Sequence, residues 1–121
     1  MDKNQSTFRK LVVWQKSMDL VTTIYIELKS FPTEELYALS SQIKRAAISI
    51  PSNIAEGYGR KTKKEYLRFL NISISSLFEL QTQLEISKNL TYLNPEKFDI
   101  LYENTREIER MLSSLIRKIE Q

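Results

Sequence analysis

Apolar side chains recur at helical spacing along almost the whole chain. They follow alternating steps of three and four residues, which place side chains on one face of an α-helix. Four such segments run from Leu11 to Leu28, Leu36 to Ala55, Leu67 to Leu84 and Leu101 to Ile119. We therefore expect four helices, over about residues 11–28, 33–57, 63–89 and 95–119.

Capping residues and breakers predict where the helices begin and end. Phe31-Pro32 interrupts the first pattern, and Thr33 is the expected N-cap of the second helix. Thr62 followed by Glu65 fits a capping box for the third helix. Asn94 before Pro95 suits the start of the fourth, because asparagine is a good N-cap and proline is favoured at the first helical position.

Pro51 lies inside the second pattern and leaves two interpretations. Either one helix ends at Ile50 and another begins, or a single helix is kinked where proline removes a backbone donor. We favour one kinked helix, because the apolar spacing continues past Pro51. Gly57 is then expected to cap it in a left-handed conformation. We expect Asn53 and Glu56 either to satisfy backbone groups that the proline frees or to accept a hydrogen bond from a neighbouring helix or subunit, in preference to a catalytic role for Glu56.

Short connections between such helices favour antiparallel neighbours. The predicted fold is all-α, an antiparallel up-down-up-down four-helix bundle with a Pro-kinked second helix. It forms a single domain over residues 1–121, in which the polar residues 1–7 are expected to be disordered. Trp14 and Tyr25 fall on the seam of the first helix that we expect to face the core.

Composition argues against several classes of function. The chain has no cysteine and no histidine, so it lacks thiol nucleophiles, imidazole acid–base chemistry and the usual ligands of zinc. It also shows no paired-carboxylate or phosphate-loop motif. We expect no enzyme activity, no metal, no cofactor and no small-molecule substrate. No apolar run approaches a membrane span and no signal peptide is evident, so we expect a cytoplasmic protein that does not bind membranes.

Positive charge is concentrated in one short segment. The net charge of the chain is +3, whereas residues 57–68 alone hold five basic groups and one acidic group. The cluster either contacts nucleic-acid phosphates or forms a solvated loop beside a helix start. The candidate nucleic-acid-binding residues are Arg60, Lys61, Lys63, Lys64 and Arg68, with Lys44 and Arg45 as an extension that depends on the kink.

Two further features suggest partners. Tyr58 lies between Gly57 and Gly59 beside the basic segment, where it is available to stack on a base, to anchor a subunit contact, or simply to pack within the loop. The apolar faces of the first and third helices are wider than a bundle needs. They indicate either a large monomer core or a second surface for self-association, and we favour self-association.

The chain resembles the four-helix bundle proteins encoded within intervening sequences of bacterial 23S ribosomal RNA genes. The strongest part of the resemblance is the run from Ser49 to Gly57, Ser-Ile-Pro-Ser-Asn-Ile-Ala-Glu-Gly. The other matching segments are Val13-Trp14-Gln15-Lys16, Phe31-Pro32, Gln42-Ile43-Lys44-Arg45-Ala46-Ala47, Lys64-Glu65-Tyr66-Leu67-Arg68-Phe69-Leu70 and Ser76-Leu77-Phe78-Glu79-Leu80.

The resemblance implies a homo-oligomeric ring, commonly of five protomers, but no settled biochemical activity. Accessory variability proteins of diversity-generating retroelements are similar in fold, and they bind nucleic acid and a reverse transcriptase. The chain is therefore expected to be a non-enzymatic homo-oligomeric scaffold that binds nucleic acid, with RNA favoured over DNA. The alternative is a protein-interaction or self-assembly module that binds no nucleic acid.

Overall fold

The fold, in a computed structural model that describes residues 7–121, consists of helices and their connections. Four long helices follow one another, α1 (Val12–Leu28), α2 (Leu39–Tyr58), α3 (Lys63–Asn89) and α4 (Pro95–Glu120). Two short 3-10 helices precede α1 and α2, namely η2 (Phe8–Lys10) and η3 (Thr33–Glu35). No strand occurs between residues 7 and 121, so the prediction of an all-α four-helix protein is confirmed.

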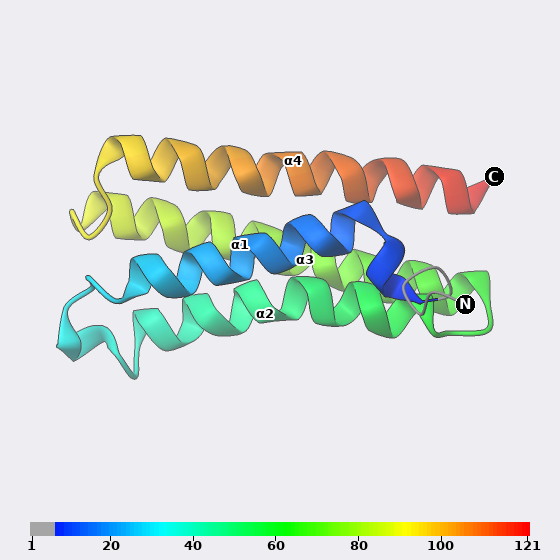
Figure 1. Ribbon diagram of the computed structural model, residues 1–121, viewed down its shortest axis with the longest axis horizontal. Helices are drawn as coiled ribbons and strands as arrows, with labels where there is room; N and C mark the ends of the chain where they lie inside the picture. The colour runs from blue at the N-terminus through cyan, green and yellow to red at the C-terminus, as the bar shows by residue number, and fades with distance from the viewer. Residues whose placement is uncertain (1–6) are drawn as a thin grey trace.

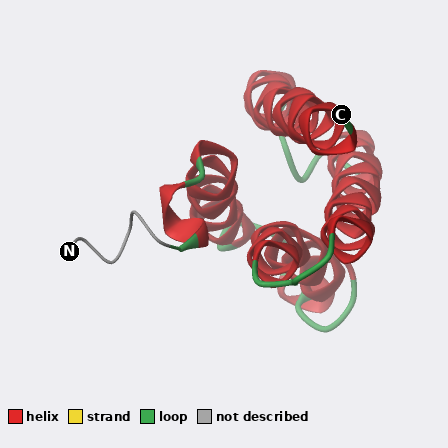
Figure 2. Ribbon diagram, turned by 90° about the vertical axis from the view of Figure 1, so that its right-hand side faces the viewer, coloured by secondary structure: helices red, strands yellow, loops and turns green. Residues whose placement is uncertain are grey.

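The four helices lie side by side around a common apolar interior. Figure 1 shows successive helices running in opposite directions along the long axis. Figure 2 looks along them from the end that holds the α2–α3 turn. Each helix contacts two others, since α1 and α3 both pack against α2 and α4. None of the helices within residues 7–121 is long and apolar enough to cross a membrane.

The core side of α1 differs from the prediction. Its buried side chains are Val13, Ser17, Leu20, Ile24 and Leu28. Of the expected core seam, Leu28 is buried and Trp14 is half-buried against the core, whereas Met18 and Tyr25 are 41% and 37% exposed. The two stripes are neighbours on the same helix and have the same spacing, so periodicity does not distinguish them. Packing against α2 and α4 buries the stripe that contains Val13, Leu20 and Ile24.

The start of the second helix was also predicted wrongly. Thr33 begins the 3-10 helix η3, its side chain caps nothing, and α2 begins only at Leu39. Glu35 holds the intervening turn, because one carboxylate oxygen accepts from the Leu39 backbone N–H at 3.3 Å. The other accepts from the Tyr92 hydroxyl at 2.8 Å. These contacts involve the α3–α4 connection, which local capping rules do not take into account.

Pro51 lies within one uninterrupted helix, as expected, whereas a kink at this position stays a prediction. α2 continues through Pro51 to Tyr58, and the proline ring is buried. Asn53 does not reach the carbonyl of Ala47 that the proline deprives of its donor. Its amide instead donates to the backbone oxygen and the hydroxyl of Ser49, at 2.8 and 2.9 Å. The Asn53 amide therefore does not satisfy the backbone group that the proline frees.

Gly57 is not a left-handed cap. No glycine within residues 7–121 has a positive φ, and the helix is capped at Gly59 with φ −80° and ψ −4°. Gly57 is buried where α2 crosses α3, and a Cβ atom there would lie 2.9 Å from the Cβ of Phe69 and 3.1 Å from Cδ1 of Tyr66. The absence of a side chain therefore permits close helix packing rather than an unusual backbone conformation.

The starts of α3 and α4 agree with the prediction. The Thr62 hydroxyl accepts from the Glu65 backbone N–H at 3.2 Å, and the Asn94 side chain accepts from the Lys97 N–H at 2.8 Å. Glu65 pairs with Arg68, so the return bond of a capping box is replaced by an ion pair. The Thr62 cap defines where the α2–α3 turn ends, and the Asn94 cap defines where the α3–α4 turn ends.

Candidate nucleic-acid interface

The predicted basic cluster lies at one end of the bundle. We call it the basic turn: it spans the α2–α3 connection and the first turns of α3, and consists of Arg60, Lys61, Lys63, Lys64 and Arg68. The N-terminal segment from residue 7 and the last turn of α4 lie at the same end of the long axis (Figure 1). The end of the molecule is therefore formed by three separate parts of the chain.

Arg60 and Arg68 are held in place at opposite ends of the basic turn. Arg60 pairs with Glu56 at 2.7 Å, and Arg68 pairs with Glu65 at 3.5 Å. Both guanidinium groups also lie over the Phe69 ring, 4.8 and 5.3 Å from its centroid. Each arginine is thus positioned by an aromatic face and partly neutralised by a carboxylate. Glu56 therefore orients Arg60 and does not satisfy the backbone groups near Pro51.

Lys61, Lys63 and Lys64 carry the available charge. All three are exposed, and none forms an ion pair with any residue from 7 to 121. Lys63 and Lys64 occupy the first turn of α3, where the helix dipole disfavours cations by roughly 0.3–1 kcal/mol each. An anion bound at this turn would relieve that repulsion and would also meet the backbone N–H groups of the helix start.

Tyr58 is half-buried rather than projecting from the turn. It is the last residue of α2, and its ring meets the edge of Tyr66 at 6.2 Å between centroids. Burial, followed by the proximity of Tyr58, raises the pKa of Tyr66 above its ordinary value of 10.0. Tyr58 and Tyr66 together form an aromatic surface beside the basic turn, which we call the aromatic floor.

Sequence reasoning missed the contribution of the N-terminal segment. The Lys10 ammonium lies 5.8 Å from the centre of the Tyr58 ring, so η2 brings another cation to the aromatic floor. The Thr7 hydroxyl caps η2 by accepting from the Arg9 N–H at 3.2 Å. The rest of the expected disordered segment, residues 1–6, lies outside the described residues. In the sequence, the adjacent basic residues Arg9 and Lys10 were the feature that could have indicated this contribution.

Lys44 and Arg45 do not join the basic turn. Arg45 lies thirteen residues before the end of α2, about 20 Å along a helix axis at 1.5 Å per residue. The Lys44 ammonium lies 4.9 Å from the Tyr25 ring centre, on the α1 side. Arg45 lines a polar hollow of about 470 Å³ between α2 and α3, together with Gln42, Ser49, Ser76 and Glu79.

The described residues offer no cluster of ligands for a metal ion. Within residues 7–121, no group of three or more His, Cys, Asp or Glu side chains comes together in a way that could hold one. The side chains of the basic turn are suited to binding anions. Its lysines supply charge, its arginines supply positioned donors, and its tyrosines supply an aromatic surface.

The fold and the site together place the chain in a class, that of small helical-bundle proteins with positive charge concentrated at one end of the bundle. Within that class the family is shown by sequence. The profile of the 23S rRNA-intervening sequence protein family matches residues 9–114, and the chain belongs to this family. No curated protein matches the chain.

A solved structure agrees with the family assignment. It is the crystal structure of a protein of unknown function from the S23 ribosomal protein family of Bacteroides thetaiotaomicron. The two chains are 27% identical and superpose with a TM-score of 0.82, over 88% of this chain and 96% of the other. The similarity therefore extends over the four helices, including α4, which was the least distinctive segment in sequence.

Proposed function

We propose that this protein is a non-enzymatic, homo-oligomeric scaffold that binds nucleic acid, with RNA favoured, through the basic turn. The observation that carries the proposal is the set of three exposed lysines, Lys61, Lys63 and Lys64, without ion pairs among residues 7–121. Unneutralised lysines on one rigid turn suit the regularly spaced phosphates of a nucleic-acid backbone.

Several neighbouring features support a phosphate-binding role for this turn. Arg60 and Arg68 are fixed against Phe69, so little side-chain freedom is lost when they bind. Lys10 and the Tyr58–Tyr66 pair extend the surface beyond the turn. RNA is favoured over DNA because the family is named after intervening sequences of 23S rRNA, and the cytoplasm is the compartment where such a partner occurs.

Self-association is supported by an exposed apolar strip along the outer side of α1 and α2. A hollow of about 340 Å³ there is lined by Trp14, Met18, Val21, Ile48 and Pro51, among others. Exposed apolar side chains that gather on one surface are typical of interaction sites. A ring would repeat the basic turn around its axis, and several weak phosphate contacts would then act together.

The test is retention of structured RNA at increasing salt. We expect the triple variant Lys61→Gln, Lys63→Gln, Lys64→Gln to bind at least about tenfold more weakly than wild type at low salt, with a shallower salt dependence, because each lost phosphate contact removes roughly one unit of the log–log slope. The measurement is a titration of fluorescent RNA from 50 to 200 mM salt.

A matched control removes the same charge elsewhere. Lys88, Lys97 and Arg106 each pair with a carboxylate away from the basic turn, and their change to glutamine leaves the turn intact. This control should retain near wild-type RNA binding. Equal loss in both variants would show that net charge alone is responsible, and equal affinity of wild type and the basic-turn variant would exclude the proposed site.

The alternative function is a protein-interaction or self-assembly module without nucleic-acid binding. The apolar strip on α1 and α2 favours it, since that surface is independent of the basic turn. This alternative predicts a defined oligomer by light scattering and no salt-sensitive retention of RNA. The native mass of the protein purified from its own cells, measured before and after nuclease treatment, distinguishes the two functions.

A further inference from the structure

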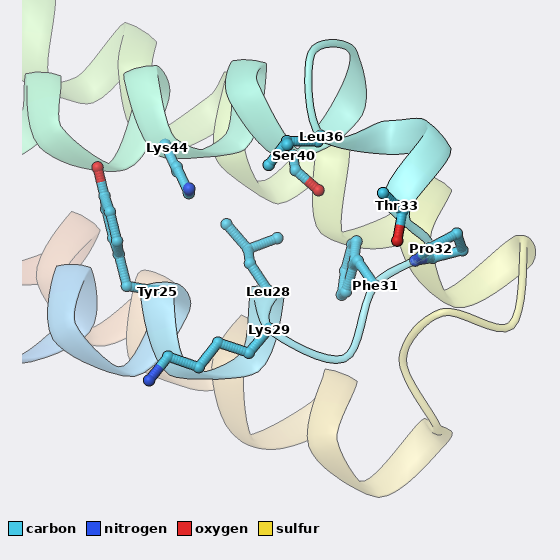
Figure 3. Close-up of a pocket in the computed structure, with 9 residues that line it drawn as sticks. All are labelled: Tyr25, Leu28, Lys29, Phe31, Pro32, Thr33, Leu36, Ser40 and Lys44. Atoms are coloured by element: carbon cyan, nitrogen blue, oxygen red, sulfur yellow. The ribbon is translucent and has the colours of Figure 1, made fainter.

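A second hollow lies at the opposite end of the molecule from the basic turn. It measures about 350 Å³ and is formed by the end of α1, the α1–α2 connection and the start of α2 (Figure 3). Leu28, Phe31 and Leu36 provide apolar walls. We call it the α1–α2 pocket.

The two charged side chains that line the α1–α2 pocket are both lysines, and its other polar side chains are neutral. Figure 3 shows the Lys44 side chain directed into the space beside Tyr25, with Lys29 along its edge. Neither lysine forms an ion pair with any residue from 7 to 121, and no carboxylate lines the pocket. The site therefore suits an apolar group that is flanked by acidic ones.

The same chain carries a group of this kind on the outer face of α4. Ile100 is 63% exposed, more than any other large aliphatic side chain in residues 7–121. Glu96, Asp99 and Glu103 lie one turn or one residue away on the helix, and all three are exposed. Glu103 pairs with Arg110 at 2.7 Å, whereas Glu96 and Asp99 have no ion pair with any described residue. We call this surface the Ile100 knob.

We propose that the Ile100 knob of one copy inserts into the α1–α2 pocket of a second copy, with Glu96 and Asp99 facing Lys29 and Lys44. The unpaired carboxylates beside Ile100 are opposite in charge to the two pocket lysines, and Lys97, the cation one turn from Ile100, is paired with Glu27. The two surfaces are therefore complementary in polarity and in charge. This contact rests on the homo-oligomeric part of the proposed function and specifies which two faces meet.

The apolar strip on α1 and α2 extends the contact beyond a single side chain. The pocket and the strip are two separate hollows beside α1, and Tyr25 of the first and Trp14 of the second lie about 16 Å apart along the helix axis. A partner helix that contacted both hollows would bury more surface than the Ile100 side chain alone. A stable interface requires about 1,200 Å² or more of buried surface. Because the two faces are different, the contact is heterologous and generates a ring when it closes.

The test uses two variants that each disable one face. Ile100→Glu removes the knob and leaves the pocket intact, whereas Leu36→Glu places an acid in the pocket wall and leaves the knob intact. Both side chains are exposed, at 63% and 45%, so the fold should persist, which circular dichroism melting checks. Ile26→Glu is the matched control, because Ile26 is 59% exposed and lies at neither face.

Native mass spectrometry and light scattering give the result. We expect an oligomer for wild type and for Ile26→Glu, and monomers for Ile100→Glu and Leu36→Glu separately. A mixture of the last two should form a 1:1 dimer that grows no further, since one intact knob meets one intact pocket. Only a heterologous contact between these two faces produces this complementation.

Three other results would contradict the proposed contact, and each would identify which part of it is wrong. An Ile100→Glu variant with wild-type mass would contradict the knob while leaving the homo-oligomer and its RNA binding in place. Monomeric variants that do not complement on mixing would contradict the pairing of knob and pocket. A wild-type protein that is itself monomeric would refute the homo-oligomeric part of the proposed function together with this contact.

Discussion

Single residues in this protein show how one residue type serves different purposes at neighbouring positions. Gly57 and Gly59 are two residues apart, and Gly57 was the one expected to cap the helix. Only Gly59 ends the helix, whereas Gly57 is buried against Phe69 and Tyr66 of α3. The sequence predicted a left-handed cap at Gly57, since helices commonly end at a glycine in that conformation. The close approach of α3 that explains it is a tertiary contact.

Substitution of these glycines should separate the two roles. Gly57→Ala adds a Cβ within 3.0 Å of the Phe69 Cβ, and we expect a net loss of about 1–2 kcal/mol of unfolding free energy, since overpacking outweighs the helix-propensity gain. The measurement is urea denaturation.

Gly59→Ala is the control, because its added Cβ meets only carbonyl oxygens at 3.7 and 3.9 Å. Its φ of −80° also suits any residue. It should be neutral or stabilising by up to about 1 kcal/mol. Equal stability of both alanine variants would contradict the close-packing role of Gly57.

At the scale of elements, the two connections at the pocket end of the bundle are tied together. The Tyr92 hydroxyl of the α3–α4 connection donates to Glu35 of η3 at 2.8 Å, and its ring packs on Phe31. This contact helps to explain why α2 begins at Leu39 rather than at Thr33. Caps that act within their own turn, such as Thr62 and Asn94, were predicted correctly because nothing distant competes with them.

The tie between Tyr92 and Glu35 should make stability sensitive to alkaline pH. The hydrogen bond to Glu35, together with burial, raises the pKa of Tyr92 above 10.0. The folded state therefore favours the protonated phenol, so this contribution is fully present below pH 10 and is lost as pH rises through the higher folded-state pKa.

Thermal melting between pH 8 and pH 11 tests this dependence. Tyr92→Phe should show a smaller alkaline loss of melting temperature than wild type, with Tyr66 responsible for part of the remainder. Tyr37→Phe serves as the control, since Tyr37 is 92% exposed and should behave as wild type. Identical alkaline profiles for Tyr92→Phe and wild type would show that the hydrogen bond does not persist in solution.

For the whole molecule, the two ends of the bundle have different proposed tasks. The basic turn lies at one end, and the α1–α2 pocket lies at the other. Assembly through the pocket and the apolar strip would leave the basic turns free, and a ring would present several of them to one nucleic acid. Oligomer formation and nucleic-acid affinity should then be coupled without any shared residue.

This coupling predicts that a monomeric variant binds RNA more weakly even though its basic turn is unchanged. Ile100→Glu should lose about tenfold to a hundredfold in apparent affinity for a long structured RNA, because avidity is lost. On an RNA too short to span two protomers, wild type and Ile100→Glu should bind alike. The measurement is the same salt-controlled titration, and an equal loss on both RNAs would argue against avidity as the cause.

The sequence alone determined the number of helices, the ends of α3 and the start of α4, and the concentration of charge between Arg60 and Arg68. These features depend on periodicity, capping and composition, which act over a few residues. The tertiary structure decided which stripe of α1 is buried, where α2 begins, why Gly57 has no side chain, and that Lys44 and Arg45 lie away from the basic turn. Each of these depends on contacts between segments far apart in the chain. The spacing of apolar residues within a helix does not specify which other helix packs against each of its faces.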